Sequence, residues 1–425
     1  AGSAAPTQEQ VSEFLAGKVA VGIITTESNG QLDPSTENWN TARLNNAESK
    51  VIEGLTFWSS VFPGANVQYT YDIRSQAPTK YEPINRDWND DSLWIDDTLM
   101  GLGYSGTDWW SRIRSYLNGI RSANGTDWAV VVFVVDSWND EDGRFRADSS
   151  GYKAFAYTWM GSGLACIVMT YDNDGWGIAN MNHVLAHEFG HCFGACDEYA
   201  SSRCSCTQSC GYLAVSNTNS EYGCTAQYYC VMRQGDYSAG ACPYTRGQVG
   251  LRDSDGDGIP DPVDTTPVVA LTTAPPPVTS QPVFTFTGDA RDIAFSSPTR
   301  DDVTINNIVA VEARVDGGSW QAATAIDGAF NTPSESFRFV TPSLSEGAHT
   351  VSFRCRNRWG NYSQMVQSSY IIDSTPPASS VQPLKAKQRL PLYIRWSGTD
   401  AGGIAGYDLQ YRSGTGGQWQ DWLLN

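Results

Sequence analysis

The chain has 425 residues, which exceeds the size of one ordinary domain and predicts two to four. Hydrophobic residues make up 40% and charged residues 17%, a composition that excludes a disordered chain. The formal charge of −18, without a Lys/Arg cluster, excludes nucleic acid as a partner. The longest apolar run, residues 129–135, is too short for a membrane span.

The first 250 residues alternate between strand-like and helix-like patterns, which predicts an α/β domain. Helical spacing covers residues 41–62, 92–100 and 108–123, with Asp108 as an N-cap, and a further helix begins near Asn180. The expected strands are residues 19–25, 67–73, 129–135, 154–159 and 165–171. The uninterrupted apolar run 129–135 is typical of a central strand that is buried on both faces.

Three of the four histidines, His183, His187 and His191, lie on the helix expected after Asn180. Residues four apart share a helix face, so His187 and His191 can bind one metal ion while Glu188 flanks a metal-bound water. His183 lies one turn earlier on the same face. A further imidazole ligand would occupy the coordination position on the metal that the hydrolytic water needs. We therefore expect His183 to have a packing or supporting role.

The run from His187 to Glu198 resembles the zinc-binding motif of metzincin peptidases, His-Glu-x-x-His-x-x-Gly-x-x-Asp in their snapalysin-like members. The resemblance implies zinc held by His187, His191 and Asp197, with Gly194 in a left-handed turn and Met232 beneath the metal. Met232 as ordinary core filler is the alternative. The Asp-Glu-Tyr segment that ends at Tyr199 is similar to bacterial immunoglobulin-A peptidases. Tyr237 is a candidate for stabilising an oxyanion.

Glu198 competes with Asp197 for the third ligand position. The family spacing favours Asp197, and neighbouring residues in an extended segment face opposite sides, so only one of the two can reach the metal. The resemblance also implies that an edge strand pairs with extended substrate, either residues 154–159 or residues 165–171.

Eight of the ten cysteines fall between residues 192 and 242, which predicts up to four disulfides and an oxidising compartment. Cys166 and Cys355 are expected to remain outside this framework. A second zinc site at Cys204, Cys206 and Cys210 is the alternative reading, although paired Cys-x-x-Cys units and a nearby His are missing from the sequence there. We therefore expect a secreted, extracellular or cell-surface protein. Because the start at Ala1 is polar and has no basic region followed by an apolar one, we expect that this chain begins after processing.

An Asp-rich segment after Leu251 has the spacing of a calcium loop and resembles thrombospondin type 3 and dockerin repeats. The expected calcium ligands are Asp253, Asp255, Asp257, Ile259, Asp261 and Asp264, with Gly258 supplying the sharp turn. The alternative is an acidic, solvated linker.

The domain plan is a metzincin-like peptidase domain at 1–250, followed by a calcium loop and Pro/Thr-rich linker at 251–282. Runs at 311–315, 337–340 and 350–354 predict an Ig-like β-sandwich at 283–373. Residues 374–425 contain strands for only part of a second, fibronectin- or Ig-like sandwich, so we expect the native chain to continue past Asn425 or a partner to cover the gap.

These features together predict a secreted zinc endopeptidase that cleaves protein or peptide substrates, with Glu188 as general base and then general acid. Two alternatives remain. One is a surface or adhesive protein that keeps a peptidase fold as scaffold. The other is a glycoprotein-directed peptidase whose β modules hold carbohydrate or another extracellular polymer.

Overall fold

The computed structural model describes residues 5–147, 151 and 153–424. Ala1 and Asn425, on which the two expectations about the chain ends rest, lie outside these ranges. The chain forms two compact units: residues 1–265 with 293–306, and residues 266–292 with 307–425. We describe each unit by itself. None of the described helices has both the length and the apolar composition that crossing a bilayer requires.

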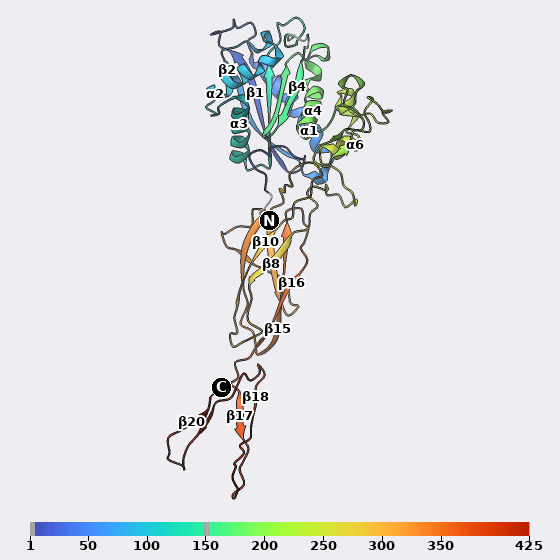
Figure 1. Cartoon of the computed structure of the whole chain (residues 1–425). Helices are drawn as coiled ribbons and strands as arrows, with labels where there is room; N and C mark the ends of the chain where they lie inside the picture. The colour runs from blue at the N-terminus through green and yellow to red at the C-terminus, as the bar shows by residue number, and fades with distance from the viewer. Residues whose placement is uncertain (1–4, 148–150, 152, 425) are drawn as a thin grey trace. The chain divides into compact units, whose positions relative to one another are not determined.

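Unit 1 is built on a five-stranded sheet in the order β2-β1-β3-β5-β4 (Figure 1). The strands are β1 (Lys18–Ser28), β2 (Gln68–Thr79), β3 (Trp128–Val135), β4 (Ala156–Gly161) and β5 (Leu164–Thr170). The first four in sheet order run parallel, and β4 pairs antiparallel with β5 at the edge. Every residue of β3 is buried, which confirms the expected central strand. Of the two candidates for the edge strand, only β4 lies at an edge.

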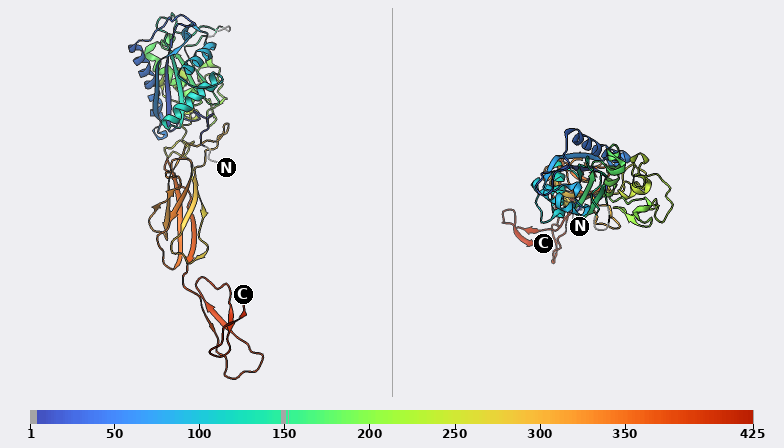
Figure 2. Two further views of the ribbon diagram at one scale, coloured as in Figure 1. Left: turned by 90° about the vertical axis from the view of Figure 1, so that its left-hand side faces the viewer. Right: turned by 90° about the horizontal axis from the view of Figure 1, so that it is seen from above.

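Two helix pairs cover the sheet of unit 1, α1 with α4 and α2 with α3 (Figures 1 and 2). Their bounds are α1 (Thr41–Val61), α2 (Asp91–Gly101), α3 (Trp109–Asn124) and α4 (Met181–Cys192). Asp108 caps α3 by accepting from Ser111 N at 2.8 Å, as its sequence position predicts. Gly54 lets α1 approach α4 closely, because a β-carbon there would lie 2.5 Å from the Asn182 carbonyl oxygen. The indole of Trp58 donates to the Ala186 carbonyl across the same contact.

The lower part of unit 1 follows α4 and has little regular structure. Its elements are β6 (Ser209–Cys210), β7 (Val215–Ser216), α5 (Val231–Gln234) and α6 (Pro243–Gln248). Two disulfides, Cys196–Cys210 and Cys206–Cys224, brace it. The sequence predicted up to four disulfides, and the structure contains two of them among the described residues. Because Cys206 and Cys210 pair with different partners, only Cys204 of the three keeps a free thiol, which is too few ligands for the alternative zinc site.

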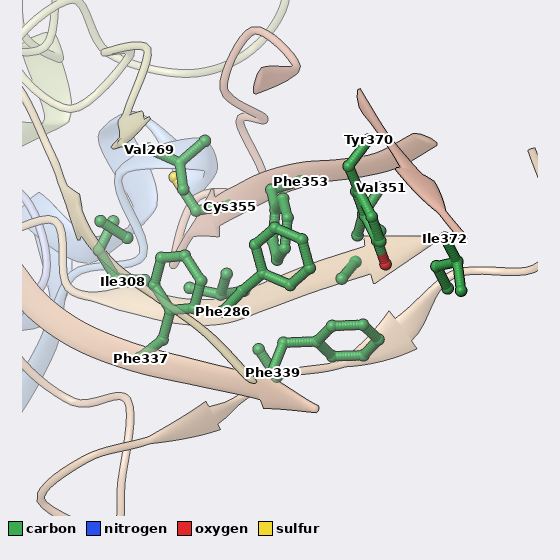
Figure 3. Packing of buried hydrophobic residues seen from close by; sticks show 14 residues of the cluster. Val269, Phe286, Ile308, Phe337, Phe339, Val351, Phe353, Cys355, Tyr370 and Ile372 are labelled. Atoms are coloured by element: carbon green, nitrogen blue, oxygen red, sulfur yellow. The ribbon is translucent and has the colours of Figure 1, made fainter. Parts of the chain in front are cut away.

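Unit 2 contains a β-sandwich of two sheets, β13-β14-β10-β8 and β12-β11-β15-β16-β9. Its strands are β8 (Val268–Thr273), β9 (Val278–Thr279), β10 (Thr285–Arg291), β11 (Ile308–Val315), β12 (Gln321–Ala322), β13 (Thr324–Ala325), β14 (Ser334–Val340), β15 (Gly347–Asn357) and β16 (Val366–Ile372). Alternate residues point inward, and Phe286, Phe337, Phe339 and Phe353 meet in the core (Figure 3). Cys355 is a buried free thiol in this core, as expected.

The observed division of the chain differs from the predicted boundaries at two places. Residues 251–265 stay with unit 1, and the predicted linker supplies β8 and β9 of the sandwich. The segment 293–306, expected within the sandwich, belongs to unit 1. Val303 N donates to the Tyr212 hydroxyl at 3.0 Å, and Arg300 pairs with Glu13 at 2.8 Å. Such long-range contacts leave no local pattern in the sequence.

Residues 374–424 form two separate two-stranded sheets, β17 (Ala378–Val381) with β18 (Trp396–Thr399) and β19 (Leu409–Tyr411) with β20 (Gln420–Leu423). None of the residues described in this stretch is buried. The hairpin expected near residues 407–422 corresponds to β19 and β20.

Candidate metal centre

Helix α4 brings His187 and His191 together one turn apart, with their Nε2 atoms 3.3 Å from each other. Each ring is oriented through its other nitrogen. His187 Nδ1 lies 3.0 Å from the Val231 carbonyl oxygen, and His191 Nδ1 lies 2.8 Å from that of Ala195. A carbonyl oxygen can only accept, so Nδ1 carries the proton in the neutral imidazoles and both Nε2 lone pairs face the space between the rings.

The chain turns back toward this pair immediately after α4. Gly194 has a φ of 91°, a left-handed conformation that favours glycine, and a β-carbon there would lie 2.7 Å from Gly211 Cα. The turn carries Asp197 to the histidines. Its Oδ1 lies 3.0 Å from His187 Nε2 and 3.2 Å from His191 Nε2.

Glu198 points away from this group into a fully buried polar network. Its carboxylate oxygens accept from Asn219 Nδ2 at 2.6 Å and Thr245 Oγ1 at 3.0 Å, and Cys242 Sγ lies 3.0 Å away. The geometry therefore favours Asp197 over Glu198 as the third ligand, because the two side chains leave the backbone on opposite sides.

The three ligand atoms have the spacing of a tetrahedral cation site. A metal with bonds of about 2.0–2.1 Å needs ligand atoms roughly 3.3 Å apart, since a tetrahedron's edge is about 1.6 times its radius. The three observed separations are 3.0, 3.2 and 3.3 Å. Asp197 Oδ1 is also buried without a hydrogen-bond donor aligned on it among the described residues. Two imidazoles and one carboxylate leave a fourth position, which is the donor set of a hydrolytic zinc site.

The electrostatics of the group also favour positive charge between the ligands. Burial acts to lower the pKa of His191, but the Asp197 carboxylate outweighs it and raises this pKa to about 9. Burial acts to raise the pKa of Asp197, but the two imidazoles hold it well below its usual range.

A turn at Cys230, Val231 and Met232 lies beneath the histidines. The Val231 carbonyl orients His187, and the Met232 carbonyl accepts from Glu198 N at 2.9 Å. Met232 is fully buried, and its sulfur would lie 2.9 Å from a β-carbon on Gly190. Gly190 thus lets the Met232 side chain pack directly against α4 between the two ligands. Both expectations for Met232, a place beneath the metal and ordinary core filling, are compatible with this contact.

A cleft of about 350 Å³ opens beside the group and is lined by His187, Glu188 and Tyr199. Ala156 at the start of β4 also lines it, so the cleft reaches the edge strand. Glu188 is 8% exposed, and its Oε2 lies 2.6 Å from Thr158 Oγ1 of β4. The cleft therefore brings together the ligand helix, one carboxylate and an open strand edge.

Three cationic side chains line the outer part of the cleft, Arg144, Lys153 and Arg233. Each pairs with a carboxylate: Arg144 with Asp174, Lys153 with Asp142 at 2.6 Å and Arg233 with Glu221 at 2.6 Å. Each of these three cations is therefore held by a salt bridge.

Two other residues singled out in the sequence lie outside the ligand group. His183 stacks on Tyr237 with ring centres 4.1 Å apart and pairs with Asp236 at 2.7 Å, which fits a packing role. The Tyr237 hydroxyl accepts from Asn182 Nδ2 at 2.8 Å. Tyr237 does not line the cleft, and the expectation that it stabilises an oxyanion is not supported, because the turn at residues 237–239 holds it against the first turn of α4.

Sequence reasoning gave no chemical role to Tyr199 and did not single out Thr158. The Tyr199 ring lies 6.2 Å from that of His187, and its place directly after Asp197 and Glu198 was the available signal. Thr158 carried no signal, because only the packing of α4 against β4 brings it to Glu188.

The Asp-rich loop gathers three of its expected calcium ligands. Oxygens of Asp253, Asp255 and Asp257 lie within 4.8 Å of one another. Gly258 has a φ of 92°, in keeping with the expected sharp turn. Asp261 and Asp264 do not join this group, and the carboxylate of Asp261 pairs with Arg252 at 2.6 Å. Asp261 is thus held by a neighbouring cation, and the full ligand set stays a prediction.

No protein-family model and no curated protein matches the chain. Among solved structures, sulfane dehydrogenase SoxCD from Paracoccus pantotrophus is 16% identical over 23% of this chain and 23% of its own, with a TM-score of 0.18. Fibronectin(III)-like modules of CbhA from Clostridium thermocellum are 19% identical over 25% and 47%, with a TM-score of 0.18. The PKD domain of an M14-like peptidase from a Thermoplasmatales archaeon is 12% identical over 26% and 97%, with a TM-score of 0.17. This chain thus spans less than half of the first two, and its function is inferred from its own residues.

Proposed function

We propose that the chain is a secreted zinc-dependent endopeptidase of the metzincin type, with zinc held by His187, His191 and Asp197. The observation that carries the proposal is the convergence of His187 Nε2, His191 Nε2 and Asp197 Oδ1 within 3.3 Å, with each imidazole oriented by a backbone carbonyl. The two disulfides and the lack of a membrane-spanning helix among the described residues are compatible with an extracellular protein.

Glu188 and the two histidines would have separate roles in peptide hydrolysis. When bound, zinc lowers the pKa of a water molecule and polarises the substrate carbonyl. Glu188 takes a proton from the attacking water and delivers it to the departing amine, so that one carboxylate serves as base and then as acid. Because the Nδ1 atoms of His187 and His191 face carbonyl oxygens, both rings would present Nε2 to the zinc.

Strand β4 is the proposed substrate platform. It is an edge strand with one side free of ladder partners among the described strands, and its first residue lines the cleft. An extended peptide can pair with this edge and bring its scissile bond to Glu188. Backbone pairing gives affinity without demanding particular side chains.

The test is casein cleavage together with zinc content for the purified chain and matched variants. Glu188→Gln should lose at least about 100-fold in kcat and keep its zinc, because it removes only the proton acceptor. Asp197→Ala should lose both. His183→Gln, on the same helix but outside the ligand group, should keep both. Full activity in Glu188→Gln would refute the proposed mechanism with Glu188 as the general base. Absence of casein cleavage by the zinc-loaded wild type would refute the peptidase and favour the scaffold alternative.

Glu198→Gln separates the two candidates for the third ligand. Its side chain lies in the buried network with Asn219 and Thr245, so the variant should bind zinc as the wild type does. Loss of zinc from Glu198→Gln with retention in Asp197→Ala would reverse the assignment.

The second candidate, carbohydrate binding by the β modules, is favoured by two exposed aromatic rings. Trp419 and Trp422 are 59% and 56% exposed. Exposed indole rings can stack on sugar faces through their apolar surfaces. Retention of the chain on insoluble polysaccharide, lost in Trp419→Ala with Trp422→Ala, would support a peptidase directed to glycan-decorated protein.

A further inference from the structure

Thr158 is the one side chain of β4 that the structure joins directly to Glu188. Its Oγ1 lies 2.6 Å from Glu188 Oε2 and 3.1 Å from the Glu188 carbonyl oxygen. A threonine hydroxyl has one proton and both neighbours are acceptors, so Thr158 donates to Glu188, and the shorter contact is to the carboxylate. Hydrogen bonds to a charged acceptor are shorter and stronger than those between neutral groups.

The opposite face of β4 is anchored independently. Tyr157 and Trp159 flank Thr158 and point to the other side of the sheet. The Trp159 indole donates to Asp91 Oδ2 at 2.5 Å, and the Tyr157 hydroxyl lies 3.3 Å from the same oxygen. Asp91 is buried at 2% exposure, and the Trp88 ring stacks on Trp159 at 6.1 Å. These contacts, with the pairing of Thr158 to Ile167 in β5, fix where the Thr158 hydroxyl lies.

We propose that Thr158 is a positioning residue that holds the Glu188 carboxylate in the orientation for proton transfer, an inference that rests on the proposed peptidase function. Thr158 fixes one carboxylate oxygen, Oε2, and leaves Oε1 to exchange the proton with water and the leaving amine. The β-branched side chain has few rotamers, so the hydroxyl stays in place as the proton moves. Because Thr158 belongs to the proposed substrate strand, β4 would position both the Glu188 carboxylate and the bound peptide.

The experiment compares Thr158→Val with two matched variants in the zinc-loaded 425-residue chain. Valine keeps the shape and removes the hydroxyl. We expect kcat to fall about 10- to 100-fold, the loss that follows from deleting a hydrogen bond to a charged group, with KM within about two-fold and zinc retained. Thr158→Ser keeps the donor and should restore most of kcat.

Thr25→Val controls for the general cost of losing a buried strand hydroxyl. Thr25 lies in β1, is 4% exposed and accepts from Gln76 N at 2.9 Å, with no contact to Glu188. The Thr25→Val variant should lower the thermal stability, as Thr158→Val does, but leave kcat unchanged. In a Glu188→Asp background the shorter carboxylate no longer reaches the hydroxyl, so Thr158→Val should add little further loss.

The possible results separate this inference from the function on which it rests. If the wild type cleaves casein and Glu188→Gln does not, but Thr158→Val has wild-type kcat, the positioning role is wrong and the peptidase stands. Equal loss in Thr158→Val, Thr158→Ser and Thr25→Val would also overturn it, since that pattern reports stability alone. If the wild type has no activity, the proposed function falls and this inference with it. If Glu188→Gln keeps all of the activity, the role of Glu188 as general base falls, and so does this inference.

Discussion

Glu82 is a buried carboxyl group, 2% exposed, that stabilises the loop before α1. Its Oε2 accepts from Thr36 N at 2.8 Å and Glu37 N at 3.3 Å. Burial raises the pKa of Glu82 from 4.5 to about 7, and the neighbouring Glu37 and Glu27 carboxylates act in the same direction. The folded state therefore holds this proton more tightly than the unfolded state does.

This shift predicts that the folded protein loses stability as the pH rises. Glu82 contributes its full stability below about pH 4.5 and loses it progressively up to about pH 7, at no more than about 1.4 kcal/mol per pH unit. Glu82→Gln keeps an acceptor but cannot ionise, so its Tm should vary less between pH 5 and 7 by thermal unfolding. Glu141→Gln, at an exposed site, should behave as the wild type. An unchanged Tm profile in Glu82→Gln would contradict this assignment.

The segment between α4 and α5 depends on cross-links more than on regular structure. The disulfides Cys196–Cys210 and Cys206–Cys224 close loops of 14 and 18 residues around it, and Asp197 lies directly after Cys196. Cross-links of this span stabilise the fold by about 3 kcal/mol each, because they restrict the unfolded chain. They also limit the motion of the segment that carries Asp197.

We expect mass spectrometry of unreduced protein to find both cross-links, with Cys166 and Cys355 as free thiols. Reduction should lower the Tm and weaken zinc binding together. Mild oxidation should next join Cys230 and Cys242, whose sulfur atoms lie within 4.8 Å of each other. Alkylation of all eight cysteines between 192 and 242 in native, unreduced protein would exclude the framework.

The Asp-rich loop contacts another segment of unit 1. A β-carbon on Gly64, in the turn Pro63–Ala65, would lie only 1.8 Å from the Gly258 carbonyl oxygen. Order in the loop is therefore coupled to the packing of the whole unit. We propose that calcium at Asp253, Asp255 and Asp257 stabilises unit 1 in this way.

Adding calcium to calcium-depleted, zinc-loaded protein should raise the Tm of unit 1. At a calcium concentration of a hundred times the Kd, binding adds about 2.7 kcal/mol to the free energy of unfolding. Asp255→Asn should reduce the response, because it removes one charged ligand, whereas Asp301→Asn, exposed and outside the loop, should not. Calorimetry can follow the two units as separate transitions. If the Tm is the same with and without calcium, the loop is an acidic linker.

The sequence alone determined the features that rest on local pattern. Helical spacing put His187 and His191 on one face with Glu188 on its flank, and Gly194 marked the left-handed turn that follows. The all-apolar run 129–135 indicated a central strand, and inward alternation indicated the sandwich. Each is predictable because the period of a helix or strand, or the freedom of glycine, acts on neighbouring residues.

Tertiary structure alone decided which distant groups meet. It chose β4 as the edge strand, set Thr158 against Glu188, moved Tyr237 away from the cleft and assigned residues 293–306 to unit 1. It also paired Asp261 with Arg252, which no carboxylate spacing could reveal. These outcomes depend on contacts between segments far apart in sequence or on competition between partners, and neither leaves a periodic signal along the chain.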